Sequence, residues 1–92
     1  MAVADAIRQK LTSLFAPSEL TVVDESARHQ GHAGHRPGGE SHFDVIIVSE
    51  QFAGLTRVER QRRVYAALEA EFRGGLHALS LKALTPAEAA RR

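Results

Sequence analysis

Apolar residues near the start of the chain recur every three or four positions, which is the spacing of one face of a helix. Polar residues fill the positions between them, so the pattern predicts an amphipathic helix over residues 2–15, ended by Ala16 and Pro17. The residues that form the apolar face are Val3, Ile7, Leu11 and Leu14.

Two segments rich in β-branched residues come next and predict two strands. Residues 20–24 form a short run, and residues 41–49 contain the sequence Val-Ile-Ile-Val. A continuous apolar run is typical of a strand with contacts on both faces, so we expect the second strand to be central in a sheet. We expect residues 26–40, which are rich in glycine and histidine, to form a flexible loop that is longer than a tight hairpin needs.

A second helical segment begins at Thr56, because a Thr followed three residues later by Glu59 matches the capping box. We expect Gly74 and Gly75 to end this segment. Its apolar face is predicted to consist of Val58, Tyr65, Leu68 and Phe72.

Residues 76–83 alternate between two faces and predict a third strand. Thr85 and Pro86 are a cap and a first helical residue, and they predict a short terminal helix. Because a helical segment joins the second and third strands, these two strands should be parallel if they are neighbours. The pattern therefore predicts an α+β fold with a three-stranded mixed sheet.

Composition limits the class of protein. A chain of 92 residues forms one domain, with a core over about residues 3–86, and buries only about 60–65% of its unfolded surface. The net charge of +1 excludes a strong overall attraction to nucleic acid or to acidic membranes. Because the chain lacks a signal-peptide core and any apolar run near ~20 residues, we expect a cytoplasmic location and no membrane partner.

Histidine is the residue type that points to chemistry. The chain has five histidines and no cysteine, so disulfides, thiolate metal sites and thiol nucleophiles are excluded. Imidazole suits iron, zinc, copper and nickel, so a loop that carries several histidines can close over a metal. The candidate ligands are His29, His32 and His35 in the loop and His77 at the start of the third strand. We expect a structural role for His42, which adjoins Phe43.

A second candidate site is the basic helical segment at residues 56–65. Arginine is the best bidentate partner for phosphate or carboxylate, so this segment could contact nucleic acid or an acidic partner. The contact candidates are Arg57, Arg60, Arg62 and Arg63. No serine has a spaced base and acid that would complete a catalytic triad, so we do not expect an enzyme.

Several spaced blocks of this sequence resemble the BolA-like proteins. The resemblance extends from about Leu20 to Pro86 and keeps the family's order of blocks. The blocks are Val23-Asp24-Glu25-Ser26, Gly39-Glu40-Ser41-His42-Phe43, Val48-Ser49 with Phe52 and Gly54, Arg60, Arg62, Val64 and Tyr65, and Leu76-His77-Ala78-Leu79-Ser80 with Thr85-Pro86. One departure is Gln61, where family members commonly have a histidine between two arginines.

The resemblance implies an αββααβ core of the class II KH-like type, with a further short helix and with the helices on one side of the sheet. It also implies a partner, a monothiol glutaredoxin, and a [2Fe-2S] cluster shared with the glutaredoxin and its glutathione. In family terms His77 is the regular ligand, and the loop supplies a second one, for which we prefer His32, then His29, then His35. The isolated chain is then a monomer without a cofactor, and the complex is a heterodimer.

Two alternatives stay open. Some BolA-like proteins are described as DNA-binding regulators, which would assign the basic segment 56–65 to nucleic acid. However, residues 52–57 do not reproduce the Gly-x-x-Gly pattern of the KH nucleic-acid loop. The other alternative is that the loop alone binds a single zinc or copper ion.

Overall fold

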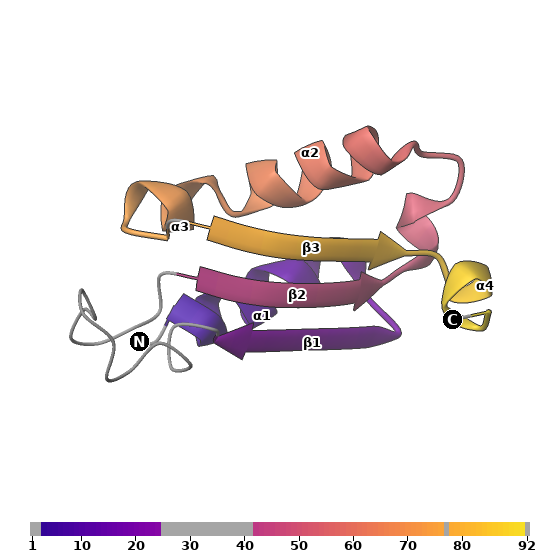
Figure 1. Cartoon of the computed structure of the whole chain (residues 1–92), viewed down its shortest axis with the longest axis horizontal. Coiled ribbons are helices and arrows are strands. Elements are labelled where there is room, and N and C mark those ends of the chain that lie inside the picture. The colour runs from indigo at the N-terminus through magenta and orange to yellow at the C-terminus, as the bar shows by residue number, and fades with distance from the viewer. Residues whose placement is uncertain (1–2, 25–41, 77, 92) are drawn as a thin grey trace.

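The computed structural model describes residues 3–24, 42–76 and 78–91. Within these residues the helices and strands follow the predicted order, and the boundaries of the strands differ only slightly from the predicted ones (Figure 1). The elements are α1 (Val3–Phe15), β1 (Glu19–Asp24), β2 (His42–Val48), the 3-10 turn η2 (Glu50–Phe52), α2 (Arg57–Ala67), α3 (Glu69–Arg73), β3 (Ala78–Leu84) and α4 (Pro86–Ala89).

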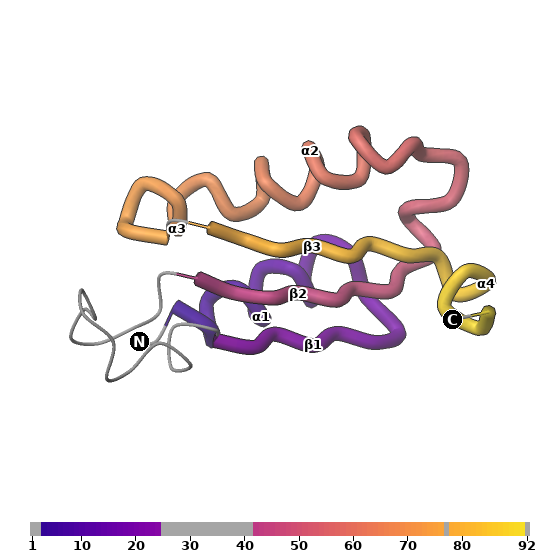
Figure 2. The backbone as a smooth tube through the Cα atoms, in the orientation of Figure 1, coloured from indigo at the N-terminus to yellow at the C-terminus, as the bar shows by residue number. Residues whose placement is uncertain are grey.

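The strands form one mixed sheet in which β2 is central. β1 is antiparallel to β2 and places Val22 opposite Val45, while β3 is parallel to β2 and places Leu81 opposite the same Val45. The predicted central strand and the predicted parallel pair are therefore confirmed. A parallel pair needs a long crossover, and the segment from η2 through α3 provides it (Figure 2).

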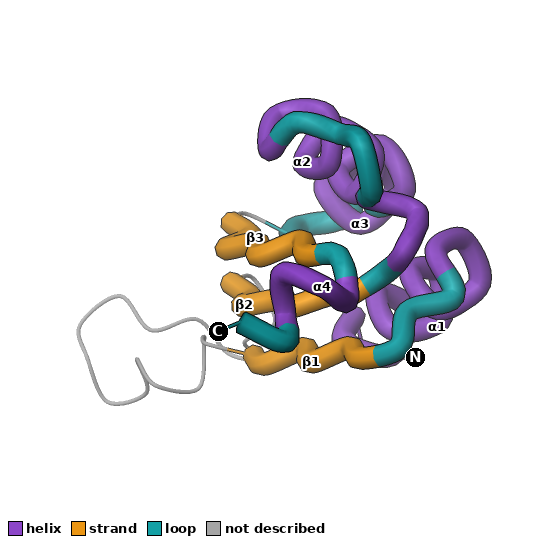
Figure 3. Tube along the Cα trace, turned by 90° about the vertical axis from the view of Figure 1, so that its right-hand side faces the viewer, coloured by secondary structure: helices purple, strands orange, loops and turns teal. Residues whose placement is uncertain are grey.

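The sheet and the helices make two layers. α1, α2 and α3 lie on one face of the sheet, and α4 lies beside the end of β3 (Figure 3). The core fills the space between that face and the helices, as the predicted architecture requires. Its buried members are Ile7, Leu11, Phe15, Val22, Phe43, Val45, Ile47, Phe52, Val64, Leu68 and Leu76.

The apolar face of α1 differs from the predicted face by one position. Ile7 and Leu11 are fully buried as expected, but the prediction for Leu14 is wrong because its exposed fraction is 54%. Phe15 takes the buried position instead, and its ring lies 5.2 Å from that of Phe52. The buried Ser49 hydroxyl donates a 2.6 Å hydrogen bond to the Phe15 carbonyl, and so satisfies a backbone group at the end of α1.

The capping box at Thr56 is confirmed: its hydroxyl accepts a hydrogen bond from the Glu59 N–H, and the Glu59 carboxylate accepts one from the Thr56 N–H. The predicted apolar face of the helix is wrong at Val58, whose exposed fraction is 53%, and Val64 is buried in its place. Val64 and Leu68 are four residues apart and therefore lie on the same face of the helix, which is the face that packs against the core.

The predicted single helical segment is divided into α2 and α3, which agrees with the two helices that the family resemblance implies. Leu68, between them, has non-helical backbone angles and a fully buried side chain. α3 is attached to α1 by the Lys10–Glu71 ion pair, in which the Nζ and Oε2 atoms lie 2.8 Å apart. Gly75, just after α3, has φ +124°, which glycine tolerates best and which explains the predicted stop.

Arg60 joins three elements. Its guanidinium donates to both carboxylate oxygens of Glu88 in α4, at 2.6 and 3.2 Å, and to the carbonyls of Leu55 and Ala83 at 3.1 and 3.0 Å. Its side chain is only 12% exposed. Because a bidentate, charge-assisted contact fixes both partners, Arg60 positions α2 against β3 and α4.

The hydrogen bonds from Arg60, followed by the one from the Thr85 N–H, lower the pKa of Glu88 from 4.5 to about 2. The Glu88 carboxylate thus supports both the contact with α2 and the capping box that begins α4. A group whose pKa is lower in the folded state stabilises that state above its unfolded pKa and loses this effect as the pH falls.

We expect Leu11→Ala to lower the free energy of unfolding by about 3 kcal/mol, because it leaves a cavity between α1 and the sheet. Leu14→Ala is the matched control about one turn further along, and it should change that free energy by less than about 0.5 kcal/mol. Urea unfolding followed by far-ultraviolet circular dichroism measures both values. Equal losses would contradict the observed apolar face of α1.

Glu88→Gln should make stability less sensitive to acid. The wild-type chain should lose the contribution of Glu88 as the pH falls from 4.5 toward about 2, whereas the variant lacks that contribution throughout. Unfolding midpoints measured across this pH range test the difference. Glu69→Gln is the control, because the Glu69–Arg73 pair is exposed and should contribute little. Parallel pH profiles for wild type and Glu88→Gln would refute the role of Glu88.

Candidate functional site

Three strand ends meet at one end of the sheet. β1 ends at Asp24, opposite Phe43, and β2 starts at His42, opposite Ala78, the first residue of β3. This end lies at the left in Figure 1, far from α4. The chain leaves β1, enters β2 and enters β3 at this same end, as antiparallel and parallel pairing to one central strand require.

The predicted metal ligands lie outside the described residues. They are His29, His32, His35 and His77. The structure does describe the neighbours of His77: Leu76 is buried in the core, and Ala78 begins β3. Among the described residues, no three histidine or acidic side chains gather in a way that could hold a metal ion.

His42 is the described histidine, and it is exposed at the first position of β2. It lies on the sheet face opposite the helices, in the same row as Ala78. Its predicted structural role stays a prediction. His42 does not form part of a metal-binding cluster among the described residues.

The four arginines of the basic segment lie in two different environments. Arg57, Arg62 and Arg63 are exposed on α2, whereas Arg60 is directed toward β3 and α4. Hydrogen bonds with Thr56, and to a smaller extent the charges of Arg63 and Arg62, lower the pKa of Glu59. The exposed arginines therefore remain available for an anionic partner, while the guanidinium of Arg60 is occupied within the fold.

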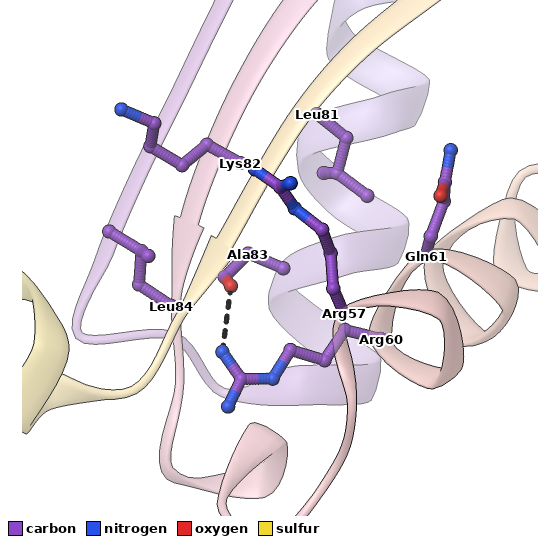
Figure 4. A pocket seen from close by; sticks show the side chains of 7 residues that line it. All are labelled: Arg57, Arg60, Gln61, Leu81, Lys82, Ala83 and Leu84. Atoms are coloured by element: carbon purple, nitrogen blue, oxygen red, sulfur yellow. Dashed lines mark hydrogen bonds between the residues drawn. The ribbon is translucent and has the colours of Figure 1, made fainter.

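A groove between α2 and β3, with a volume of about 390 Å³, was not predicted from the sequence. Figure 4 shows that its lining combines side chains of α2 with four consecutive residues of β3. Arg57 extends from the start of α2 over β3, and the Arg60 guanidinium reaches the Ala83 carbonyl. The alternating pattern of residues 76–83 predicted β3, but nothing in the sequence indicated that the arginines of α2 would lie beside this strand.

A second hollow, of about 400 Å³, lies where α1 ends and α4 begins. Ser49 contributes to its lining, but the Ser49 hydroxyl donates to the Phe15 carbonyl and accepts from the Gln51 N–H. This serine therefore satisfies backbone groups, and no general base in the described residues contacts it. Within the same residues, no helix is both long enough and apolar enough to cross a membrane.

Relatives of known name are similar to this chain over most of its length. SufE-like protein 1, chloroplastic/mitochondrial, from Arabidopsis thaliana is 48% identical over 86 residues, which are 89% of this chain but only 23% of that protein. The DNA-binding transcriptional regulator BolA of Escherichia coli is 41% identical over 85 residues, which are 92% of this chain and 77% of that protein. The chain thus spans less than a quarter of the plant relative.

The solved structure of BolA1 from Arabidopsis thaliana has the same fold as this chain, with a TM-score of 0.85 and 43% identity over 96% of both chains. The family described as BolA-like protein matches residues 11–88, which include every strand of the sheet described above. Sequence, fold and relatives agree, and this chain belongs to the BolA-like protein family.

Proposed function

We propose that this chain is a non-enzymatic adaptor that pairs with a monothiol glutaredoxin and supplies histidine ligands to a shared [2Fe-2S] cluster. The observation that carries the proposal is the meeting of Asp24, His42 and Ala78 at one end of the sheet. The histidine-bearing segment is connected to the fold through Asp24 and His42, and His77 immediately precedes Ala78. Chain connectivity therefore supports ligands from both segments at this end.

The donor set fits such a cluster only if a partner brings sulfur. A cluster normally held by four thiolates cannot be held by a chain without cysteine, whereas imidazoles can replace thiolates on one iron. Such a cluster, when bound, has a higher reduction potential than one with thiolates alone. In this proposal His77 is one ligand, and the second comes from the loop, with His32 preferred over His29 and His35.

The two described neighbours of His77 in the chain both belong to the packed part of the fold. Leu76 is 4% exposed and packs in the core, and Ala78 is fixed by pairing with His42 in β2. Because regular elements position a site more accurately than loops do, we assign the constant ligand position to His77, the residue between these two neighbours. We further propose that the chain is a monomer when unbound and forms a heterodimer with glutaredoxin. We also propose a cytoplasmic location, which differs from the chloroplastic or mitochondrial location in the name of the Arabidopsis relative.

Titration of this chain into a [2Fe-2S]-loaded monothiol glutaredoxin under anaerobic conditions should change the visible circular dichroism and saturate at one chain per glutaredoxin. His77→Ala should abolish this new spectrum, because one imidazole ligand is removed. His42→Ala is the matched control from the same end of the sheet and should retain the change. The same spectrum from His77→Ala, with its fold verified by thermal unfolding, would exclude His77 as a ligand.

A second candidate function is DNA binding by α2. It is favoured by the exposed side chains of Arg57, Arg62 and Arg63 and by the name of the Escherichia coli relative. Phosphate contacts by exposed arginines provide salt-dependent attraction without base recognition. Arg60 is left out of this surface because its guanidinium donates to Glu88 and to backbone carbonyls.

The combined substitution Arg62→Ala and Arg63→Ala should weaken duplex binding. It should also flatten the dependence of affinity on the logarithm of salt concentration, by about 0.9 for each phosphate that the variant no longer neutralises. Fluorescence anisotropy with a labelled duplex measures both effects. Arg73→Ala removes an exposed arginine from α3 and is the control that should leave binding unchanged. The absence of binding by the wild-type chain at low salt would eliminate this function.

A further inference from the structure

β3 is an edge strand, and α2 covers only part of its outer edge. The sheet order places β2 on one side of β3, and Figures 1 and 3 place α2 beside the other. Two backbone carbonyls on this outer edge are bonded to side chains of α2. The Tyr65 hydroxyl donates to the Leu79 carbonyl at 3.1 Å, and the Arg60 guanidinium donates to the Ala83 carbonyl at 3.0 Å.

Leu81 lies between these two bonded positions. Alternate residues of a strand direct their backbone groups to the same edge, so the N–H and C=O of Leu81 point outward like those of Leu79 and Ala83. No side chain of the described residues forms a hydrogen bond with the backbone of Leu81, and this residue lines the groove between α2 and β3. One donor and one acceptor of a sheet edge thus lie beside the groove without a side-chain partner among the described residues, and such groups are a template for a further strand.

The charge around this opening has one sign. Arg57, Gln61 and Lys82 line the groove together with Arg60, and no acidic residue lines it. Arg60 is neutralised by Glu88, but neither Arg57 nor Lys82 has a counter-ion among the described residues. Figure 4 shows Arg57 extended over β3 beside Leu81, while Lys82 belongs to the opposite face of the strand. A ligand at the Leu81 edge would therefore meet positive charge on both faces of β3.

We propose that this groove binds an extended acidic segment of a partner protein, which pairs with the Leu81 backbone and directs carboxylates at Arg57 and Lys82. Strand addition to an exposed edge obtains affinity from backbone hydrogen bonds and specificity from side chains on alternate positions. A single-stranded nucleic acid is the less suitable occupant, because none of the lining residues is aromatic and bases need a stacking surface. The proposal is independent of the cluster, which is assigned to the other end of the sheet.

The Tyr65 and Arg60 contacts limit the length of the added strand. Leu79 and Ala83 are four residues apart, or about 13 Å along a strand, so only the residue opposite Leu81 can form a full backbone pair. So few hydrogen bonds give little affinity, and the carboxylate contacts must supply the rest. We therefore expect weak binding that depends strongly on charge.

The test is an amide NMR titration of the full chain with a short peptide in which pairs of adjacent glutamates alternate with valines, because neighbouring residues of an extended strand direct their side chains to opposite faces. The Leu81 and Ala83 amide signals should shift, and Arg57→Glu should weaken binding about tenfold or more, since it replaces a charged hydrogen bond by repulsion. Arg62→Glu makes the same charge change on α2 outside the groove and should leave affinity within about twofold once salt has screened distant charges.

Two further peptides separate backbone pairing from simple charge attraction. Methylation of alternate backbone nitrogens should abolish the Leu81 shift while the peptide's charge is unchanged, and lysine in place of glutamate should abolish binding. Equal binding by the methylated peptide, or equal losses in Arg57→Glu and Arg62→Glu, would overturn the proposal. It would also be overturned if a single-stranded oligonucleotide moved the Leu81 signal and the acidic peptide did not.

Discussion

The parallel pairing of β3 with β2 is the constraint on which the rest of the structure depends. It requires a long crossover, so η2, α2 and α3 must return the chain to the end of the sheet where β2 began. It also gives β2 a neighbour on both edges. The expectation of apolar contacts on both faces of β2 is wrong, because the helices cover one face only and Ile46, on the other face, is only partly buried. Because parallel strands begin at the same end of the sheet, this pairing also brings the start of β3, next to the proposed ligand His77, to the end where β2 begins.

The crossover also determines how the arginines of α2 are used. Because α2 runs beside β3, Arg60 can reach the Ala83 carbonyl and Glu88, and its side chain then belongs to the fold. Arg57, one turn earlier, extends over the strand edge without such a partner in the described chain. One basic segment therefore has two functions: Arg60 stabilises the packing of three elements, and the exposed arginines give the surface its positive charge.

Periodicity predicted the elements and the topology, but it did not determine which neighbouring residue is buried. Leu14 and Phe15 are adjacent apolar residues, and Val58 fits the pattern of α2 as well as Val64 does, so only packing against the sheet distinguishes them. The role of Arg60 depends on Glu88, a residue distant in sequence, and the repeating arginines gave no sign of it. The predicted histidine ligands lie outside the described residues and stay predictions.

The central claim is that an imidazole of this chain binds iron in a cluster shared with a glutaredoxin. Pulsed electron paramagnetic resonance of the reduced complex tests this most directly when only this chain carries isotopically labelled histidine nitrogen. We expect strong hyperfine couplings from the bound nitrogens that change with the label, and the coupling of the His77 nitrogen should be absent in His77→Ala. A spectrum without any coupling that responds to the label would contradict the claim, because it would show that no histidine of this chain is a ligand.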